Sequence, residues 1–196
     1  MRPHPLPFVW PYALAFWGVF VWVFTPEWGV VRRARGRASD PQDAGSLWAI
    51  MIGNQIAMAL ALTLAWVAPS ATIDRRVPLF WVGIAVLAAG SLLRRHCFRM
   101  LGQSFTGAVQ VHTGQTVVDR GAYRWVRHPS YSAGIMMFAG IGLALGNWLS
   151  LASMVLITAA AYGYRVTVEE RALAATLGEP YREYMRRTKR FVPYLV

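Results

Sequence analysis

The sequence contains little cysteine and little negative charge. Its single cysteine, Cys97, cannot form a disulfide within the chain and belongs to no Cys/His set with metal-ligand spacing, so we expect no metal site. Asp and Glu number nine against 20 Lys and Arg, which gives a formal net charge of +11. No nucleic-acid recognition module accompanies this surplus, so we expect anionic lipid headgroups as its partner and no nucleic acid.

Long apolar runs, in contrast, are abundant. Hydrophobic residues make up 56% of the 196 positions, which is more than one soluble domain of this length needs for its core. A helix requires about 20 apolar residues to cross a bilayer. Candidate spans cover residues 8–24, 47–68, 79–93 and 131–164. The last is too long for one helix, and Gly146, Asn147 and Trp148 divide it into a helical hairpin. The sequence therefore predicts an all-α integral membrane protein with about five transmembrane helices.

Basic residues gather on one side of this predicted topology. Seventeen of the 20 Lys and Arg residues follow the first or third span or lie in the tail from residue 165, and the other three are Arg2, Arg75 and Arg76. Because cytoplasmic loops carry the excess of Lys and Arg, we expect the N-terminus outside and the C-terminus in the cytoplasm, in the plasma membrane of a prokaryote. Arg94 and Arg95, at the end of the third span, would have to lie at the interface or snorkel toward it.

Polar chemistry is concentrated in GAYRWVRHPSY, residues 121–131, directly before the longest apolar run. Pro129 disfavours helical geometry at His128 and should lie in the first turn of the fourth helix. The N-terminus of a helix presents unpaired N–H groups that favour an anion such as a carboxylate. Taken alone, the arginines and aromatics of this stretch could be interfacial anchors, whereas a histidine gains little there and favours function.

A second polar segment, RVTVEERALAATLGEPYREYMRRTKRFVP, occupies residues 165–193. Arg165 and Glu169 are four residues apart and would share a helix face, as in an ordinary surface ion pair. We expect a helix to restart after Gly178, with Pro180 in its first turn. Because the hairpin places residue 131 near residue 164, the two polar segments should face each other across a pocket at the cytoplasmic edge of the membrane.

Three motifs in order, LGQSFTGAVQ, GAYRWVRHPSY, and the pair R-x-x-x-E-E-x-x-L with G-x-x-Y-x-x-Y, resemble those of the isoprenylcysteine carboxyl methyltransferase family of integral membrane enzymes. The similarity covers roughly residues 94–193, and the earlier spans are similar only as hydrophobic helices. We therefore divide the chain into a three-span membrane region, residues 1–93, and a methyltransferase core, residues 94–196. The core would contain a cofactor-binding connecting loop, the helical hairpin 131–164 and a cytoplasmic C-terminal helix.

The resemblance implies S-adenosylmethionine as cofactor, S-adenosylhomocysteine as product, and a lipophilic acceptor that arrives from the bilayer. Methyl transfer from a sulfonium to an anionic acceptor needs the partners held in line and dry, and it needs no metal. The expected cofactor-binding residues are Gln110, Tyr123, Val126, Arg127, His128, Tyr131, Glu170, Tyr181 and Tyr184. The expected catalytic residues are Arg165, Glu169 and Arg187.

Each expected residue has a chemical rationale. Arg127 and His128 would bind the carboxylate of the cofactor, and Glu169 or Glu170 its ammonium or ribose hydroxyls. Faces for adenine and the sulfonium would come from Tyr123, Tyr131, Tyr181 and Trp125, and Gln110 would reach the cofactor. Arg165 and Arg187 match arginines of the family motifs and would orient an acceptor carboxylate.

Two departures from the family pattern concern the acceptor. Ala133 stands where the family usually has glycine, and Gln115 replaces a frequent histidine. We favour the carboxylate of an isoprenylcysteine or a similar lipophilic acid. A phospholipid amine and a small thiol are alternatives within the superfamily, which also contains nicotinamide-dependent reductases, and a non-catalytic membrane scaffold is the alternative of another class. Gly83, Gly140 and Ala144 could support helix association, and the oligomeric state is left open.

Overall fold

The structure, a computed structural model, describes residues 4–35, 43–102 and 117–192. Its elements, in chain order, are η1 (Leu6–Phe8), α1 (Tyr12–Arg35), α2 (Ser46–Val67), η3 (Pro69–Ala71), α3 (Arg76–Leu101), η5 (Gly121–Arg124), α4 (Pro129–Leu145), α5 (Trp148–Leu177) and α6 (Glu179–Arg187). The predicted all-α architecture is confirmed for the described residues.

Five long helices occupy the positions of the five predicted spans. Helices α1, α2, α3 and α5 are long and apolar enough to cross a membrane, whereas α4 is a shorter apolar helix of 17 residues. At 1.5 Å per residue, α4 is about 25 Å long, slightly less than a bilayer core of about 30 Å. The predicted count of five therefore corresponds to four membrane-length helices and one shorter one.

Helix ends differ from the predicted spans because charged side chains do not stop a helix that is supported by packing. Helix α1 starts at Tyr12 and runs beyond residue 24, and α3 continues beyond residue 93 to Leu101. Helices α3 and α5 end instead at Gly102 and Gly178, whose φ angles of 52° and 64° suit glycine. The helix restarts after Gly178, as predicted. The division of the chain at residue 93 stays a prediction.

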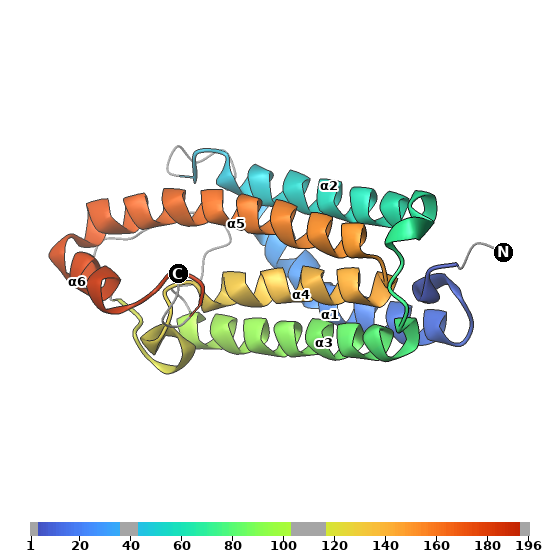
Figure 1. The fold of residues 1–196 in the computed structure, drawn as a ribbon. Coiled ribbons are helices and arrows are strands. Elements are labelled where there is room, and N and C mark those ends of the chain that lie inside the picture. Colours follow the sequence, from blue (N-terminus) through green and yellow to red (C-terminus); the bar gives the residue numbers. More distant parts are fainter. Residues whose placement is uncertain (1–3, 36–42, 103–116, 193–196) are drawn as a thin grey trace.

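The helices form a bundle in which α2 packs on α5, α5 on α4 and α4 on α3, while α1 lies behind and contacts α3 (Figure 1). The α3–α4 contact is close because glycine faces backbone there. A Cβ on Gly83 would lie 2.5 Å from the amide nitrogen of Ala144, and one on Gly140 would lie 2.5 Å from that of Leu87. These small residues serve helix packing within the chain.

The α4–α5 turn has the predicted position. Gly146 has a left-handed φ of 67°, and Asn147 caps α5 because its Oδ1 accepts a hydrogen bond from Ser150 N at 3.0 Å. The Asn147 Nδ2 group donates to the carbonyl of Ala68 at 2.8 Å, which ties the turn to the end of α2. The hairpin prediction is confirmed.

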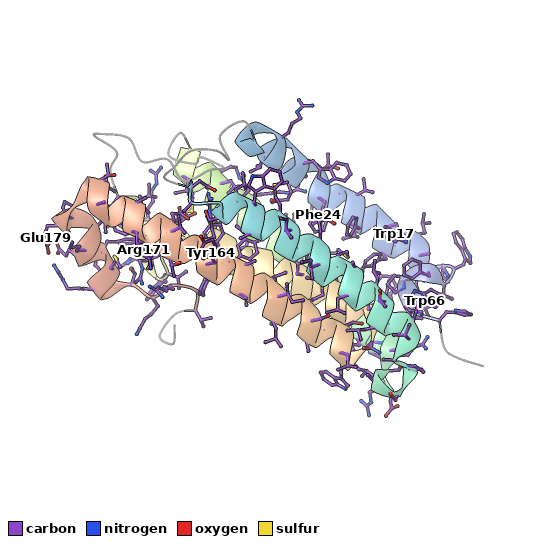
Figure 2. All side chains as sticks on the ribbon, turned by 90° about the horizontal axis from the view of Figure 1, so that it is seen from above. Trp17, Phe24, Trp66, Tyr164, Arg171 and Glu179 are labelled. Carbon is purple, nitrogen blue, oxygen red and sulfur yellow. The ribbon has the colours of Figure 1, made fainter. Side chains whose placement is uncertain are left out.

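The two ends of the bundle differ in chemistry. Exposed aromatic side chains, including Trp17 and Trp66, project from α1 and α2, whereas Arg171 and Glu179 lie at the α5–α6 end (Figure 2). Helix α6, η5 and the start of α4 lie together at that end (Figure 1). Those functional residues predicted from the sequence that the structure describes lie toward this end as well.

Candidate active site

The turn before α4 is held by the chain segment that follows α6. His128 has φ −125° and directly precedes Pro129 at the start of α4. In this non-helical conformation, Arg127 N donates to the carbonyl of Lys189 at 2.7 Å and His128 N to that of Arg190 at 3.0 Å. Val126 is buried and forms an isolated parallel bridge with Lys189. The tail thus lies beside GAYRWVRHPSY.

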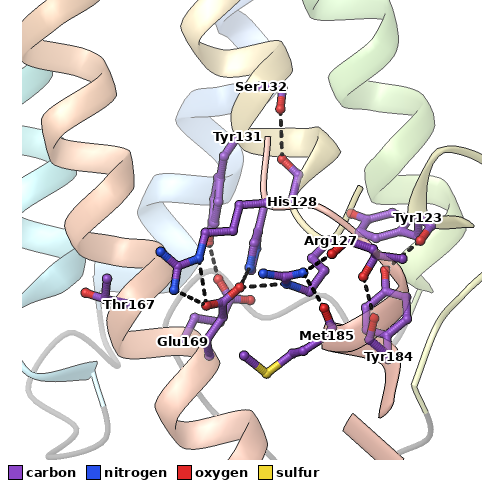
Figure 3. Close-up of polar contacts among 12 residues, drawn as sticks. Tyr123, Arg127, His128, Tyr131, Ser132, Thr167, Glu169, Tyr184 and Met185 are labelled. Atoms are coloured by element: carbon purple, nitrogen blue, oxygen red, sulfur yellow. Dashed lines mark hydrogen bonds and ion pairs between the residues drawn. The ribbon is translucent and has the colours of Figure 1, made fainter. Parts of the chain in front are cut away.

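Glu170 of α5 is the centre of a cluster of basic side chains, two of which, Arg127 and His128, are labelled in Figure 3. Its Oε1 accepts from Arg127 Nε at 2.8 Å and lies 3.3 Å from His128 Nε2, and its Oε2 lies 2.8 Å from a terminal nitrogen of Arg190. The Glu170 side chain is only 4% exposed. A buried carboxylate requires charged or hydrogen-bonding partners, and Glu170 has three from two distant segments.

Arg127 also connects this cluster to α6. One of its terminal nitrogens donates to the carbonyl of Met185 at 3.0 Å and to that of Thr188. Carbonyls at the C-terminal end of a helix have no partners within the helix and favour a cation. Arg127 therefore joins the start of α4, helix α5 and the end of α6.

Tyr131 contacts Glu169 of α5 (Figure 3) and also Arg165, one helical turn earlier. Its hydroxyl donates to Glu169 Oε2 at 2.6 Å and accepts from Arg165 Nε at 3.2 Å. The Tyr131 ring stacks on that of His128, with centroids 5.5 Å apart. Arg165 is 2% exposed, so the interpretation of Arg165 and Glu169 as a surface pair is wrong. The two predicted polar segments do face each other.

Arg165 has partners that sequence reasoning missed. A terminal nitrogen of Arg165 forms an ion pair with Asp43 and donates to Ser46 Oγ at 2.8 Å. Asp43 lies in the connection before α2, Ser46 is the first residue of α2, and both are fully buried. The sequence contained one signal for this contact. Asp43 lies four positions before Leu47, where an apolar run begins, and an acidic residue at such a position is typical of a helix N-terminus.

Three predicted tyrosines hold α6 in place. The Tyr184 hydroxyl donates to the carbonyl of Tyr123 at 2.6 Å, and the rings of Tyr181 and Tyr184 lie 5.9 Å apart. Burial raises the pKa of the Tyr123, Tyr181 and Tyr184 phenols well above their usual value, so all three are protonated at neutral pH.

The remaining predicted residues lie elsewhere. Arg187 is exposed, pairs with Asp119 at 2.9 Å and lies over the Tyr184 ring at 5.8 Å, so the structure does not bring it to Arg165. Gln110 and Gln115 lie outside the described residues. The roles of all these residues stay predictions.

A cavity of about 610 Å³ lies on the membrane side of this polar cluster. Helices α1, α2, α4 and α5 contribute its mainly apolar walls, to which α3 adds Arg94. Its lining includes Phe20, Phe24, Leu47, Met51, Met58, Met137, Phe138 and Tyr162. Four of its polar or charged lining residues, Glu27, Arg94, Tyr131 and Arg165, come from four different helices.

Arg94 points into the protein instead of snorkelling away from it. Its Nε lies 2.8 Å from Glu27 Oε1, and a terminal nitrogen donates to the carbonyl of Ser130 at 2.6 Å. Arg95 stacks over the Trp22 ring at 4.3 Å. Both arginines contact α1, but Arg94 is buried and also reaches α4, whereas Arg95 is only half-buried.

The sequence profile of the isoprenylcysteine carboxyl methyltransferase (ICMT) family matches residues 81–175. The chain is thus similar to this family over slightly less than half of its length. A probable protein-S-isoprenylcysteine O-methyltransferase from Oryza sativa subsp. indica is 24% identical over 152 residues, which cover 74% of this chain and 80% of that protein. The Homo sapiens protein-S-isoprenylcysteine O-methyltransferase is 30% identical over 115 residues, covering 58% of this chain and 40% of the human one.

A solved structure supports the fold independently. The eukaryotic intramembrane Ras methyltransferase ICMT superimposes with a TM-score of 0.61 at 23% identity, covering 74% of this chain. The match covers 52% of that protein, so this chain spans about half the length of the solved relative. The family resemblance seen in the motifs is confirmed, and the profile match begins earlier than the motifs, within α3.

Proposed function

We propose that this protein transfers a methyl group from S-adenosylmethionine to the carboxylate of an isoprenylcysteine or a similar lipophilic acid. The observation that carries this proposal is the position of Arg165 and Tyr131. Both line the apolar cavity, and both belong to the same hydrogen-bonded set as Glu169, one residue before the Glu170 cluster. A lipophilic acceptor in the cavity would therefore present its polar end beside the proposed donor site.

The residues around Glu170 fit the amino acid part of S-adenosylmethionine. That part is a zwitterion, and the cluster holds one buried carboxylate against Arg127, His128 and Arg190. Arg127 and His128 would exchange part of their pairing with Glu170 for the donor's carboxylate, and Glu170 would accept from its ammonium. Such an exchange keeps every buried charge paired.

The cations of the cavity favour an anionic acceptor. Arg94 and Arg165 both line it, and each presents a planar guanidinium suited to carboxylate oxygens. Glu27 and Asp43 balance these two charges, so a phospholipid amine beside the cationic donor would leave the site positive. A carboxylate would leave it neutral and would accept hydrogen bonds from the guanidiniums. This is the reason for preferring carboxyl methylation to amine methylation.

The chemistry makes few demands on the protein. When bound, the donor would supply an electrophilic methyl on a sulfonium: methylation of a carboxylate oxygen would form a C–O bond and break the C–S bond, whose electron pair would stay on sulfur. No proton moves, because the acceptor is already ionised. The protein contributes alignment through Arg165 and Tyr131, and the apolar walls exclude water, which strengthens these interactions.

We further propose that the N-terminus lies outside and that the α5–α6 end faces the cytoplasm of a prokaryotic cell. The Lys and Arg residues concentrate on that side of the predicted topology, where they would contact anionic headgroups. This orientation gives the Glu170 cluster access to a soluble donor.

The test combines titration and turnover in detergent. Wild-type protein should bind S-adenosylhomocysteine at one site by calorimetry, and His128→Ala should lose this binding. Radiolabelled methyl transfer to an N-acetylated S-farnesyl cysteine should be lost in Arg165→Ala with product affinity retained. Arg182→Ala, exposed on α6, is the matched arginine control and should behave as wild type. A folded wild-type protein that binds no S-adenosylhomocysteine, or that methylates phosphatidylethanolamine instead, would contradict the proposal.

A further inference from the structure

The connection between α1 and α2 supplies the most buried carboxylate near the cavity. Asp43 is 0% exposed and is separated by 122 residues from its ion-pair partner Arg165, whose own side chain is 3% exposed. The sequence predicted headgroup contacts for the basic residues of the chain and no role for Asp43. Burying both charges is costly unless the pair is well bonded, so this contact requires an explanation.

The backbone around Asp43 is shaped to hold this carboxylate in place. The next two residues, Ala44 and Gly45, have φ angles of 44° and 72°, and a left-handed conformation is unfavourable for alanine. The Ala44 carbonyl accepts from the Tyr164 hydroxyl at 2.9 Å. Asp43 Oδ2 accepts from the backbone N–H of Leu47 in the first turn of α2 at 2.9 Å. One carboxylate oxygen is thus fixed by α2, and the other meets Arg165.

This arrangement fixes the guanidinium of Arg165 along two of its nitrogens. One terminal nitrogen is held by Asp43 and Ser46, while Nε is directed at the Tyr131 hydroxyl, which in turn donates to Glu169. An arginine side chain has many rotamers, but its guanidinium is planar and rigid. Fixing one edge of the guanidinium therefore determines the direction of its other nitrogens. Arg165 and Tyr131 both line the 610 Å³ cavity, so the orientation of Arg165 affects the shape of the cavity wall.

We infer that Asp43 is a positioning residue for the acceptor: it holds Arg165 in the orientation that receives the acceptor's carboxylate next to Tyr131. This inference rests on the proposed role of Arg165 in carboxyl methylation. It assigns a function to the α1–α2 connection, which lies outside the segment matched by the family profile. It also explains why a strained turn is kept at this position.

The test uses Asp43→Asn, which removes the charge and keeps a side-chain oxygen for Leu47 N–H, because Asn and Asp cap helices equally well. We expect kcat/KM for the farnesylated cysteine acceptor to fall about 10- to 100-fold, since small misplacement of an orienting group has effects of this size. The dissociation constant for S-adenosylhomocysteine should stay within about twofold of wild type. Asp74→Asn, exposed in the connection before α3, is the matched control and should leave both quantities unchanged.

A double-mutant cycle separates positioning from general stability. In an Arg165→Gln background, Asp43→Asn should have no further effect on acceptor kcat/KM, because its whole effect passes through Arg165. The inference is overturned if Asp43→Asn turns over like wild type, if it reduces activity equally in both backgrounds, or if it weakens product binding as much as acceptor use. Full activity in Arg165→Gln would instead contradict the proposed role of Arg165 in carboxyl methylation. This result is distinct from those that contradict the positioning role of Asp43.

Discussion

The charge of Glu170 should be essential to both the stability of the α5–α6 end and donor binding. Glu170→Gln preserves the shape of the side chain but leaves Arg127, His128 and Arg190 without their shared anion. Breaking a buried ion pair by removing one partner costs about 3–5 kcal/mol. At this chain length, about 2–4 °C of melting temperature correspond to each kcal/mol, so we expect a decrease on the order of 10 °C.

Two assays in detergent would measure this effect. Intrinsic tryptophan fluorescence follows thermal unfolding, and calorimetry measures S-adenosylhomocysteine binding, which should weaken at least about tenfold because one charge-assisted hydrogen bond is lost. Glu179→Gln on α6 is the matched control: its carboxylate is 63% exposed although it pairs with Arg186, so neither quantity should change measurably. A Glu170→Gln protein with wild-type melting temperature and product affinity would refute the assignment of this cluster.

Two further predictions concern packing and ionisation. Gly140→Ala places a Cβ 2.5 Å from the backbone nitrogen of Leu87 and should destabilise the protein by about 1–3 kcal/mol in thermal unfolding, whereas Gly18→Ala meets nothing within 4 Å and should be neutral or stabilising. Burial raises the pKa of the Tyr181 and Tyr184 phenols in the folded protein. The unfolded chain loses these protons at about pH 10, whereas the folded protein keeps them. The free energy of unfolding should therefore fall as the pH rises above that value. A melting temperature followed from pH 8 to 11 should decline less steeply in Tyr181→Phe than in wild type, and equal slopes would count against this explanation.

Local signals in the sequence were sufficient for some features. The Gly146–Asn147 turn follows from residues that favour turns and caps, and the non-helical backbone of His128 at the start of α4 follows from its position before Pro129. The spacing of Arg165 and Glu169 placed them on one helix face next to Tyr131. In each case the decisive residues are neighbours in the chain or lie one helical turn apart.

Contacts between distant segments were not predictable in the same way. The inward direction of Arg94 depends on Glu27, 67 residues away on another helix, and the pairing of Arg165 depends on Asp43. Helical periodicity specifies which residues share a face, but it specifies neither the rotation of one helix against another nor their relative height. The position of Arg190 beside Glu170 likewise requires the tail to return to the start of α4.

The distribution of acidic residues connects the site to the chemistry proposed for it. Four of the nine acidic residues, Glu27, Asp43, Glu169 and Glu170, contact arginines or Tyr131 around the cavity and the cluster. The arginines they balance are Arg94, Arg165, Arg127 and Arg190, so the site is close to neutral although the chain carries +11. A neutral, buried site binds a pair of reactants most easily when their own charges cancel. S-adenosylmethionine, with its one net positive charge, and a carboxylate acceptor form such a pair, whereas the same donor with an amine acceptor does not.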